Sequence, residues 1–245
     1  MELKTRRAAT VTPPHRHEHH RDVQGGAARA AVFGVSDGLL TNVSLILGVA
    51  AAHPAPGVVR LAGFAGLVAG AFSMATGEYV SMSAQRELIE REVGIEREEL
   101  RRHPESEHKE LVALYVSRGV PAGAAEEVAT ALARDPDLAL EVHAREELGV
   151  NPGSIGSPRA AAASSLGSFA FGALVPLLPW FFSSGTPAVV ASIILGAVMA
   201  IFVGVAVASF TGKSKVRTAA RQLAIAALAA AVTYGVGTAV GVHST

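Results

Sequence analysis

The sequence predicts an all-α, polytopic membrane protein with five transmembrane helices and a cytoplasmic helical insert between the second and the third. Half of the 245 residues are hydrophobic, and the mean hydropathy of +0.36 is high for a chain in which 17% of residues are charged. The stretch from Ala160 to Gly212 holds 53 residues without one Asp, Glu, Lys, Arg or His. A soluble helix keeps a polar face, whereas a membrane span needs about 20 apolar residues in a row.

The insert is predicted by the distribution of charge. Sixteen of the 21 acidic residues lie between Arg86 and Glu147 beside nine basic ones, so this block carries a formal charge of −7 and the rest of the chain +7. A pool of carboxylates between membrane spans is typical of a protein that gathers cations. The chain has no cysteine, so metal ligands must be oxygen, nitrogen or thioether sulfur.

Five apolar segments are long enough to span a bilayer. The first covers residues 30–52, with Asp37 as its only charge, and the second covers 58–83, with Glu78 near its end. Turn residues at 183–187 divide the uncharged tract. The last three spans are therefore expected at residues 161–182, 188–210 and 222–242.

Lys and Arg in the short flanks predict the orientation. The segment before the first span carries six of them and the fourth connection includes Lys213, Lys215 and Arg217, whereas the first connection carries only Arg60 and the third none. This pattern places the N-terminus and the insert in the cytoplasm and the C-terminus outside. The first 29 residues are polar and basic, so no cleavable signal peptide is expected. The expected units are a disordered His/Arg-rich tail (1–28), two spans (29–85), the insert (86–151) and three spans (152–245).

The insert is expected to be helical. Residues 86–102 continue the second span without a helix breaker, and Pro121 and Pro136 suit the first turns of later helices. Gly119 and Gly149 suit positions just after helix ends. These signals predict further helices at residues 106–117, 122–133 and 136–148.

Four glutamates of the insert are candidate metal ligands. Glu96 and Glu99 share one helix face, and Glu107 and Glu110 repeat that spacing on the next helix. A turn at His103 that folds the second helix back on the first would bring all four carboxylates together. Oxygen ligands in this number suit Fe²⁺ or Mn²⁺. The alternative is a solvated face on which these acids pair with interleaved arginines.

Three residues of the first two spans are candidates for an ion path. Asp37 is the sharpest, because a carboxylate within a span usually faces a cavity or a partner. Glu78 lies close enough to the membrane surface to be a headgroup contact instead. Met74 offers a soft thioether, although methionine in an apolar helix also acts as packing material.

Two weaker histidine signals remain. Residues 15–20 of the tail (HRHEHH) suit either loose metal capture or a solvated disordered segment. Glu105 and His108 form one Glu-x-x-His motif, but a ferritin-type di-iron centre needs two such motifs on different helices.

Four stretches carry a resemblance to a known family: AAVFGVSDGLLTNVSLILGVA, AGAFSMATGEYVSMSAQRE, GALVPLLPW and ASFTGKSKVR. From Arg29 onward the chain resembles the vacuolar iron transporter (VIT) family. The resemblance implies proton-coupled export of Fe²⁺ from the cytosol, extending to Mn²⁺ and related ions, by a homodimer with the ion path between its subunits. It also implies five spans with a cytoplasmic helical insert after the second.

The resemblance assigns roles to individual residues. Asp37 and Met74 fall on the family's membrane-path aspartate and methionine. The metal-binding glutamates of the family's insert fall on Glu96, Glu99, Glu107, Glu110 and Glu147.

Two departures from plant-like members affect these assignments. His143 stands where those members have a methionine, and an imidazole binds Fe²⁺ or Mn²⁺ with an added pH dependence. Gly66 stands where they carry a glutamate in the second span. We expect Glu78 to supply the missing carboxylate from another depth.

The resulting hypothesis is an Fe²⁺/H⁺ antiporter in which the insert collects metal for a path lined by Asp37 and Met74. The expected partners are divalent metal ions, protons, the lipid bilayer and a second copy of the chain, with no resident cofactor and no nucleic acid. The Ala-rich composition favours a bacterial plasma membrane. Two alternatives stay open: a membrane-anchored, ferroxidase-like di-iron protein, and a metal-sensing membrane protein without transport.

Overall fold

The fold is built entirely of helices within residues 26–150 and 156–242, which are the residues that the computed structural model describes. Nine helices occur in this part of the chain: α1 (Gly26–Ala51), α2 (Pro56–Arg102), α3 (Pro104–Ser117), α4 (Ala122–Leu132), α5 (Pro136–Glu146), α6 (Pro158–Leu177), α7 (Pro179–Phe182), α8 (Gly185–Thr211) and α9 (Lys215–Val242).

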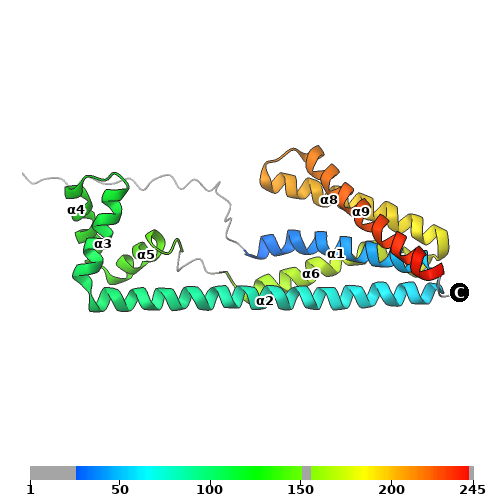
Figure 1. Cartoon of the computed structure of the whole chain (residues 1–245), viewed down its shortest axis with the longest axis horizontal. Coiled ribbons are helices and arrows are strands. Elements are labelled where there is room, and N and C mark those ends of the chain that lie inside the picture. Colours follow the sequence, from blue (N-terminus) through cyan, green and yellow to red (C-terminus); the bar gives the residue numbers. More distant parts are fainter. Residues whose placement is uncertain (1–25, 151–155, 243–245) are drawn as a thin grey trace, which may run out of the picture.

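Five of the described helices, α1, α2, α6, α8 and α9, are long and apolar enough to cross a membrane. They lie side by side in one bundle, and α3, α4 and α5 gather around the far end of α2 (Figure 1). The predicted fold class, an all-α polytopic membrane protein with five spans, is therefore confirmed.

Helix α2 connects the two parts of the molecule. Its 47 residues form one unbroken helix about 70 Å long, more than twice the hydrocarbon thickness of a bilayer. The prediction that residues 86–102 continue the second span is confirmed. The helix ends where Pro104 follows His103, because the residue before a proline is disfavoured in helical geometry.

The third predicted span differs from the structure at its C-terminal end. The helix expected to run unbroken to residue 182 is divided into α6 and the short α7 at Leu178. Pro179 has no amide hydrogen to continue the backbone ladder. Beside this break, the Ser192 hydroxyl donates to the carbonyl of Pro176 at 2.7 Å and accepts from the Trp180 indole nitrogen at 3.1 Å.

Small residues allow the spans to approach closely, as expected for helices packed in lipid. A Cβ on Gly38 of α1 would collide with the carbonyl oxygen of Phe169 of α6, and one on Gly172 of α6 would collide with the carbonyl oxygen of Val35. A Cβ on Gly237 of α9 would likewise meet the backbone of Gly48. Backbone contact of this kind fixes α1 between α6 and α9.

The insert has a small apolar core of its own. Val93 of α2 packs against Leu140 and Ala144 of α5, so α5 returns along the helix that leads into the insert. Helix α3 leaves the end of α2 steeply instead of folding back along it (Figure 1). At the start of α5, the Asp135 carboxylate accepts hydrogen bonds from the backbone amides of residues 137 and 138 at 3.1 and 3.3 Å.

Candidate metal centre and membrane path

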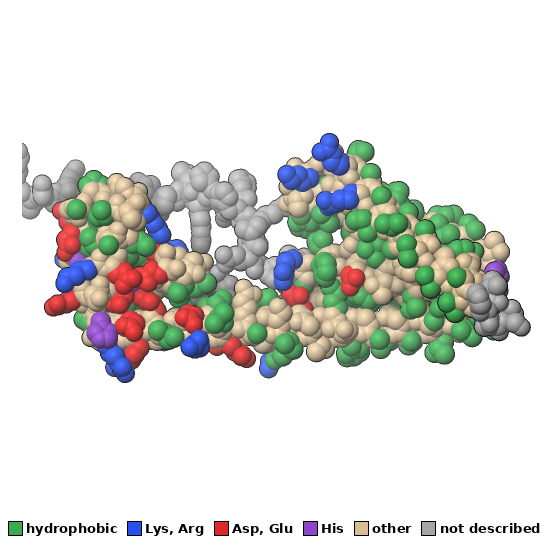
Figure 2. Space-filling view, in the orientation of Figure 1, with side chains coloured by type: hydrophobic (Ala, Val, Ile, Leu, Met, Phe, Trp, Pro, Cys, Tyr) green, Lys and Arg blue, Asp and Glu red, His purple; other side chains and the backbone are tan. Residues whose placement is uncertain are grey.

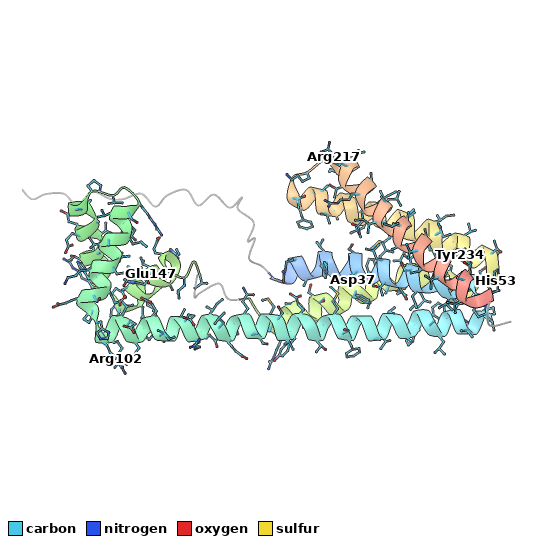
Figure 3. The ribbon with its side chains drawn as sticks, in the orientation of Figure 1. Asp37, His53, Arg102, Glu147, Arg217 and Tyr234 are labelled. Atoms are coloured by element: carbon cyan, nitrogen blue, oxygen red, sulfur yellow. The ribbon has the colours of Figure 1, made fainter. Side chains whose placement is uncertain are left out.

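Four side chains from three helices converge inside the insert. They are Glu96 of α2, Glu107 of α3, His143 of α5 and Glu147, which directly follows α5, and they can each offer one ligand atom such that all four atoms lie within 4.8 Å of one another. Glu147 is labelled at this junction in Figure 3, and acidic side chains are dense on this face of the insert in Figure 2. We call these four residues the insert cluster.

His143 is the centre of the insert cluster. Its Nδ1 lies 3.1 Å from Glu96 Oε1, 3.1 Å from Glu147 Oε1 and 3.8 Å from Glu107 Oε2. The residue is only 2% exposed, and Glu147 lies one helical turn further along the chain on the same face. A neutral imidazole with its proton on Nε2 would present the Nδ1 lone pair to the space that the three carboxylates share.

Two of the three carboxylates of the cluster are withdrawn from water, whereas Glu147 is exposed. Glu96 is 8% exposed and Glu107 7%, and Glu96 Oε1 is buried without a hydrogen bond. Burial is the largest cause that raises the pKa of Glu96 above its usual range, followed by the negative charge of Glu147. Burial likewise raises the pKa of Glu107, followed by the charge of Glu110. Buried anions that repel one another are the environment that a bound cation would stabilise most.

The structure brings together only two of the four glutamates expected to meet at the turn. Glu96 and Glu107 lie in the insert cluster, whereas Glu99 and Glu110 are exposed at its rim. Glu99 is bonded to His103 Nδ1 at 3.0 Å. The expectation that α3 folds back on α2 is wrong. Glu99 and Glu110 lie near the cluster, and their charges help to raise the pKa of Glu107, but they are not among its four converging side chains.

The other acids of the insert match the alternative of a solvated face. Glu98 pairs with Arg101 and Arg102, and further helix pairs join Arg86 to Glu90 and Arg145 to Glu141. Among the described residues, no Lys or Arg forms an ion pair with a carboxylate of the insert cluster. The insert therefore has two groups of acids. One group pairs with arginines on the surface, and the acids of the insert cluster have His143 as their only basic partner among the described residues.

The single Glu-x-x-His motif does not join the cluster. His108 Nε2 lies 2.8 Å from Glu126 Oε1, so this imidazole faces α4. Glu105 is exposed. The tail histidines at residues 15–20 lie outside the described residues.

The three membrane candidates have different surroundings. Asp37, labelled midway along α1 in Figure 3, is half-buried, and Thr41 Oγ1 donates to its Oδ1 at 3.4 Å. Met74 is half-buried and packs on a small cluster that includes Phe169 and Ala173 of α6. Glu78 is occupied by an ion pair with Arg29 at 3.2 Å.

One polar side chain of the spans was not singled out from the sequence. Asn42 of α1 is fully buried, its amide nitrogen donates to the carbonyl oxygen of Ala173 at 2.6 Å, and its Oδ1 has no hydrogen-bond partner. The sequence could have indicated Asn42 by its amide side chain within an apolar span, since polar side chains at such positions are energetically costly and often functional.

Comparisons with known proteins agree along nearly the whole chain. The sequence pattern of the VIT family matches residues 28–238. The chain is 33% identical to vacuolar iron transporter 1 of Oryza sativa subsp. japonica over 233 residues, which cover 92% of this chain and 91% of that protein. It is 37% identical to the vacuolar iron transporter of Acanthamoeba castellanii, covering 90% and 82% of the two chains. It is 29% identical to vacuolar iron transporter 1 of Arabidopsis thaliana, covering 89% and 88%.

Proposed function

Because this chain belongs to the VIT family, we propose that it exports Fe²⁺, and also Mn²⁺, from the cytosol in exchange for protons. Its relatives are named vacuolar iron transporters, which supports movement of a metal ion across a membrane. The observation that carries the proposal is the insert cluster, whose carboxylates lack a basic partner other than His143. One of them, Glu96, lies on the helix that is continuous with a membrane span.

The donor set of the insert cluster suits a borderline divalent cation. Three carboxylates and one imidazole nitrogen are hard or intermediate ligands, as Fe²⁺ and Mn²⁺ prefer. A metal ion there would relieve the repulsion that raises the pKa values of Glu96 and Glu107. Since the same carboxylates bind either protons or metal, capture releases protons and acid releases the metal. Glu99 and Glu110 at the rim are proposed as the first contacts of an arriving ion.

The proposed path continues through the spans along Asp37 and Met74. Asp37 is the proton-exchanging group, because it is a carboxylate within a span and only a threonine hydroxyl is bonded to it. We assign Glu78 an anchoring role, since its ion pair with Arg29 joins α2 to the start of α1.

The direction of transport rests on the arrangement of charge. Basic side chains gather at the turn between α8 and α9, at the same end of the bundle as the start of α1 (Figure 2). Following the positive-inside rule, we propose that this end and the insert face the cytoplasm. The bacterial plasma membrane remains our proposal for the location.

A homodimer would cover the apolar flank that a single chain leaves open. Only 17% of the residues in the most apolar stretch of α2 are buried, and this helix exposes Leu61, Phe64, Val68 and Phe72. Asp37 and Met74 on the neighbouring α1 and α2 are both partly exposed. We propose that two copies meet across these helices and enclose the ion path between them.

The ferroxidase alternative is weakened by the position of its motif. Glu105 and His108 contribute nothing to the insert cluster, and no second Glu-x-x-His occurs in the sequence. The sensor alternative shares the metal centre and differs in predicting no flux.

Anaerobic flux measurements in proteoliposomes test the proposal. We expect saturable Fe²⁺ movement driven by an imposed proton gradient, with proton counterflow that is absent from empty liposomes. Saturable metal binding without flux would support the sensor, and oxygen consumption with Fe²⁺ but no ion movement would support the ferroxidase.

A further inference from the structure

In the described part of the spans, the side chain of Asn42 is fully buried and its amide oxygen has no hydrogen-bond partner. The side chain is 0% exposed, and its nitrogen is held by the carbonyl oxygen of Ala173 at 2.6 Å. The Oδ1 atom is left buried without a donor. Burying an amide group without its hydrogen bonds destabilises a protein, and the lipid around a span offers no water to reduce that cost.

Two buried hydroxyls, those of Ser44 and Ser165, also lack a hydrogen-bond partner, but their position is different. A serine hydroxyl rotates about one bond and can turn to a carbonyl of its own helix. Asn42 Oδ1 cannot rotate toward a new donor without taking the amide nitrogen away from Ala173. Its orientation is therefore fixed, and the vacant acceptor is a permanent feature of this conformation.

The vacant oxygen lies beside Gly66 of α2. A Cβ built on Gly66 would lie 3.3 Å from Asn42 Oδ1 and would collide with the isobutyl group of Leu45, a flexible side chain that now occupies this place. An oxygen from α1 thus lies at the place where a side chain on residue 66 would begin. Glu78, which we expected to supply a carboxylate for this region, is instead paired with Arg29.

This position also continues the proposed path. Asn42 follows Asp37 by five residues on α1, about 7.5 Å along the helix axis in the direction away from the insert. Ala173, which holds the Asn42 amide, belongs to the small cluster on which Met74 packs. Met74 and Asn42 therefore both lie at the part of α6 around Ala173, where α1 and α2 pack on it.

We propose that Asn42 Oδ1 is an intramembrane ligand for the transported divalent cation, in the place opposite Gly66 where a side-chain carboxylate is absent. The inference rests on the proposed transport function and adds a ligand to it. Amide oxygens are accepted ligands of hard cations. Because a neutral oxygen carries no titrating proton, proton exchange in the spans of this chain is concentrated on Asp37. The neutral ligand also binds the ion less strongly than a carboxylate, which favours its onward release.

The test compares Asn42→Leu, which keeps the number and branching of the side-chain atoms but removes the oxygen, with Asn42→Asp, which keeps an oxygen and adds a charge. In proteoliposomes we expect Asn42→Leu to raise the KM for Fe²⁺ by about tenfold or more, a loss of the size seen when ligand support is removed from a metal site. We expect Asn42→Asp to lower the KM, to slow maximal flux and to make flux more dependent on pH. Both variants should change the ratio of Fe²⁺ to Mn²⁺ transport, which a packing role would leave unchanged.

Ser44→Ala is the matched control, because it removes a buried hydroxyl without a hydrogen-bond partner two residues further on α1. We expect its KM and metal ratio to equal those of the unaltered protein. If Asn42→Leu does not fold, Asn42→Asp alone decides: an unchanged KM, pH dependence and metal ratio would overturn the inference. The same result for a folded Asn42→Leu would also overturn it, as would equal effects of Ser44→Ala.

Failure of this inference is distinguishable from failure of the proposed function. If the unaltered protein carries Fe²⁺ and Asp37→Asn does not, transport stands, and only the Asn42 results decide the additional ligand. If the unaltered protein carries no metal in exchange for protons, the proposed function and the inference both fall.

Discussion

The insert and the membrane bundle handle charge in opposite ways. In the insert, three carboxylates surround one imidazole, and five other acids pair with arginines. In the described spans, Asp37 accepts a hydrogen bond from a threonine hydroxyl, Glu78 pairs with Arg29, and Asn42 keeps a vacant neutral oxygen. The first region is built with several ligands at one point, and the second has single ligands spread along a helix.

This difference follows from what each solvent tolerates. A soluble helical domain can hold several buried anions because its surface acids are hydrated and paired, and metal binding offsets their repulsion. A membrane span bears about 2.5–3.5 kcal/mol for each charged side chain at its centre, so charges there are few. Many ligands at one point favour capture, and few ligands in sequence favour passage. The contrast implies that the two regions fail differently when a ligand is removed.

The largest effect should come from the spans. Asp37→Asn removes the proposed proton-exchanging carboxylate of the path, and we expect Fe²⁺ flux to fall by about 100-fold or more, the usual scale for loss of a proton-transfer group. Metal affinity of the insert should stay unchanged, because the insert cluster is built from other helices. Flux in proteoliposomes and calorimetric metal binding check the two halves. Undiminished flux would remove Asp37 from the mechanism.

The next largest effect should come from the insert cluster. Glu107→Gln removes one buried ligand charge, and we expect the Kd of the insert for Fe²⁺ or Mn²⁺ to rise by about 10–100-fold. Flux should fall at low metal concentration and recover at high concentration. Glu127→Gln makes the same change at an exposed residue of α4 and should alter neither quantity. Equal losses in the two variants would indicate a general charge effect.

A pH titration sharpens the comparison further. Because burial and neighbouring carboxylates raise the pKa of Glu96 and Glu107, protons should displace metal from the insert at a higher pH than from ordinary carboxylates. Because the folded state raises these two pKa values, it binds protons more tightly than the unfolded state. The metal-free insert is therefore most stable at a pH below the pKa of an unfolded carboxyl group, and it loses stability as the pH rises through the raised pKa values of Glu96 and Glu107. Thermal unfolding across this window should show a lower Tm at neutral pH, which added metal restores.

Removing the negative charge of Glu110, which helps to raise both pKa values, should move the titration to lower pH. Glu110→Gln is the variant for this measurement. A metal-affinity profile with the same midpoint as the unaltered protein would contradict the electrostatic coupling across the rim.

The smallest effect should come from His143→Met. A thioether keeps one ligand but is softer than imidazole and does not titrate. We expect a few-fold loss of Mn²⁺ affinity relative to Fe²⁺ and a shallower pH dependence, measured by competition binding. A preference between the two metals identical to that of the unaltered protein would show that His143 is not a ligand.

Much of the fold follows from patterns that are local in the sequence. The uncharged tract from Ala160 to Gly212 and the breaker-free continuation of the second span predict helices whose identity depends on composition alone. The apolar stretch GALVPLLPW predicts one continuous span, because its composition does not change at Leu178. The break there comes from Pro179, which lacks the amide hydrogen that would continue the helix. Small residues such as Gly38 indicate that helices pack closely, but they do not indicate which helix is the partner.

Residue spacing predicts which side chains of the candidate site share one helix face, but not which helices meet. Glu96 and Glu99 share a helix face, but whether they share a site depends on the angle at which α3 leaves α2. That angle is set by packing among three helices and by the backbone at His103. The meeting of His143 with Glu96 was expected from family resemblance alone, because the 46 residues between them carry no local signal for it. Asn42 required the structure, since only burial and hydrogen bonding distinguish it from a packing residue.

The division between capture and passage is tested most directly by measuring binding and flux in the same preparations of two variants. One carries Asp37→Asn, and the other carries Glu96→Gln, Glu107→Gln and Glu147→Gln together. We expect the first to bind metal in its insert with unaltered affinity but to carry none, and the second to bind weakly yet approach normal flux at saturating Fe²⁺. Loss of flux at saturation in the triple variant, or loss of insert binding in Asp37→Asn, would contradict the separation of the two roles.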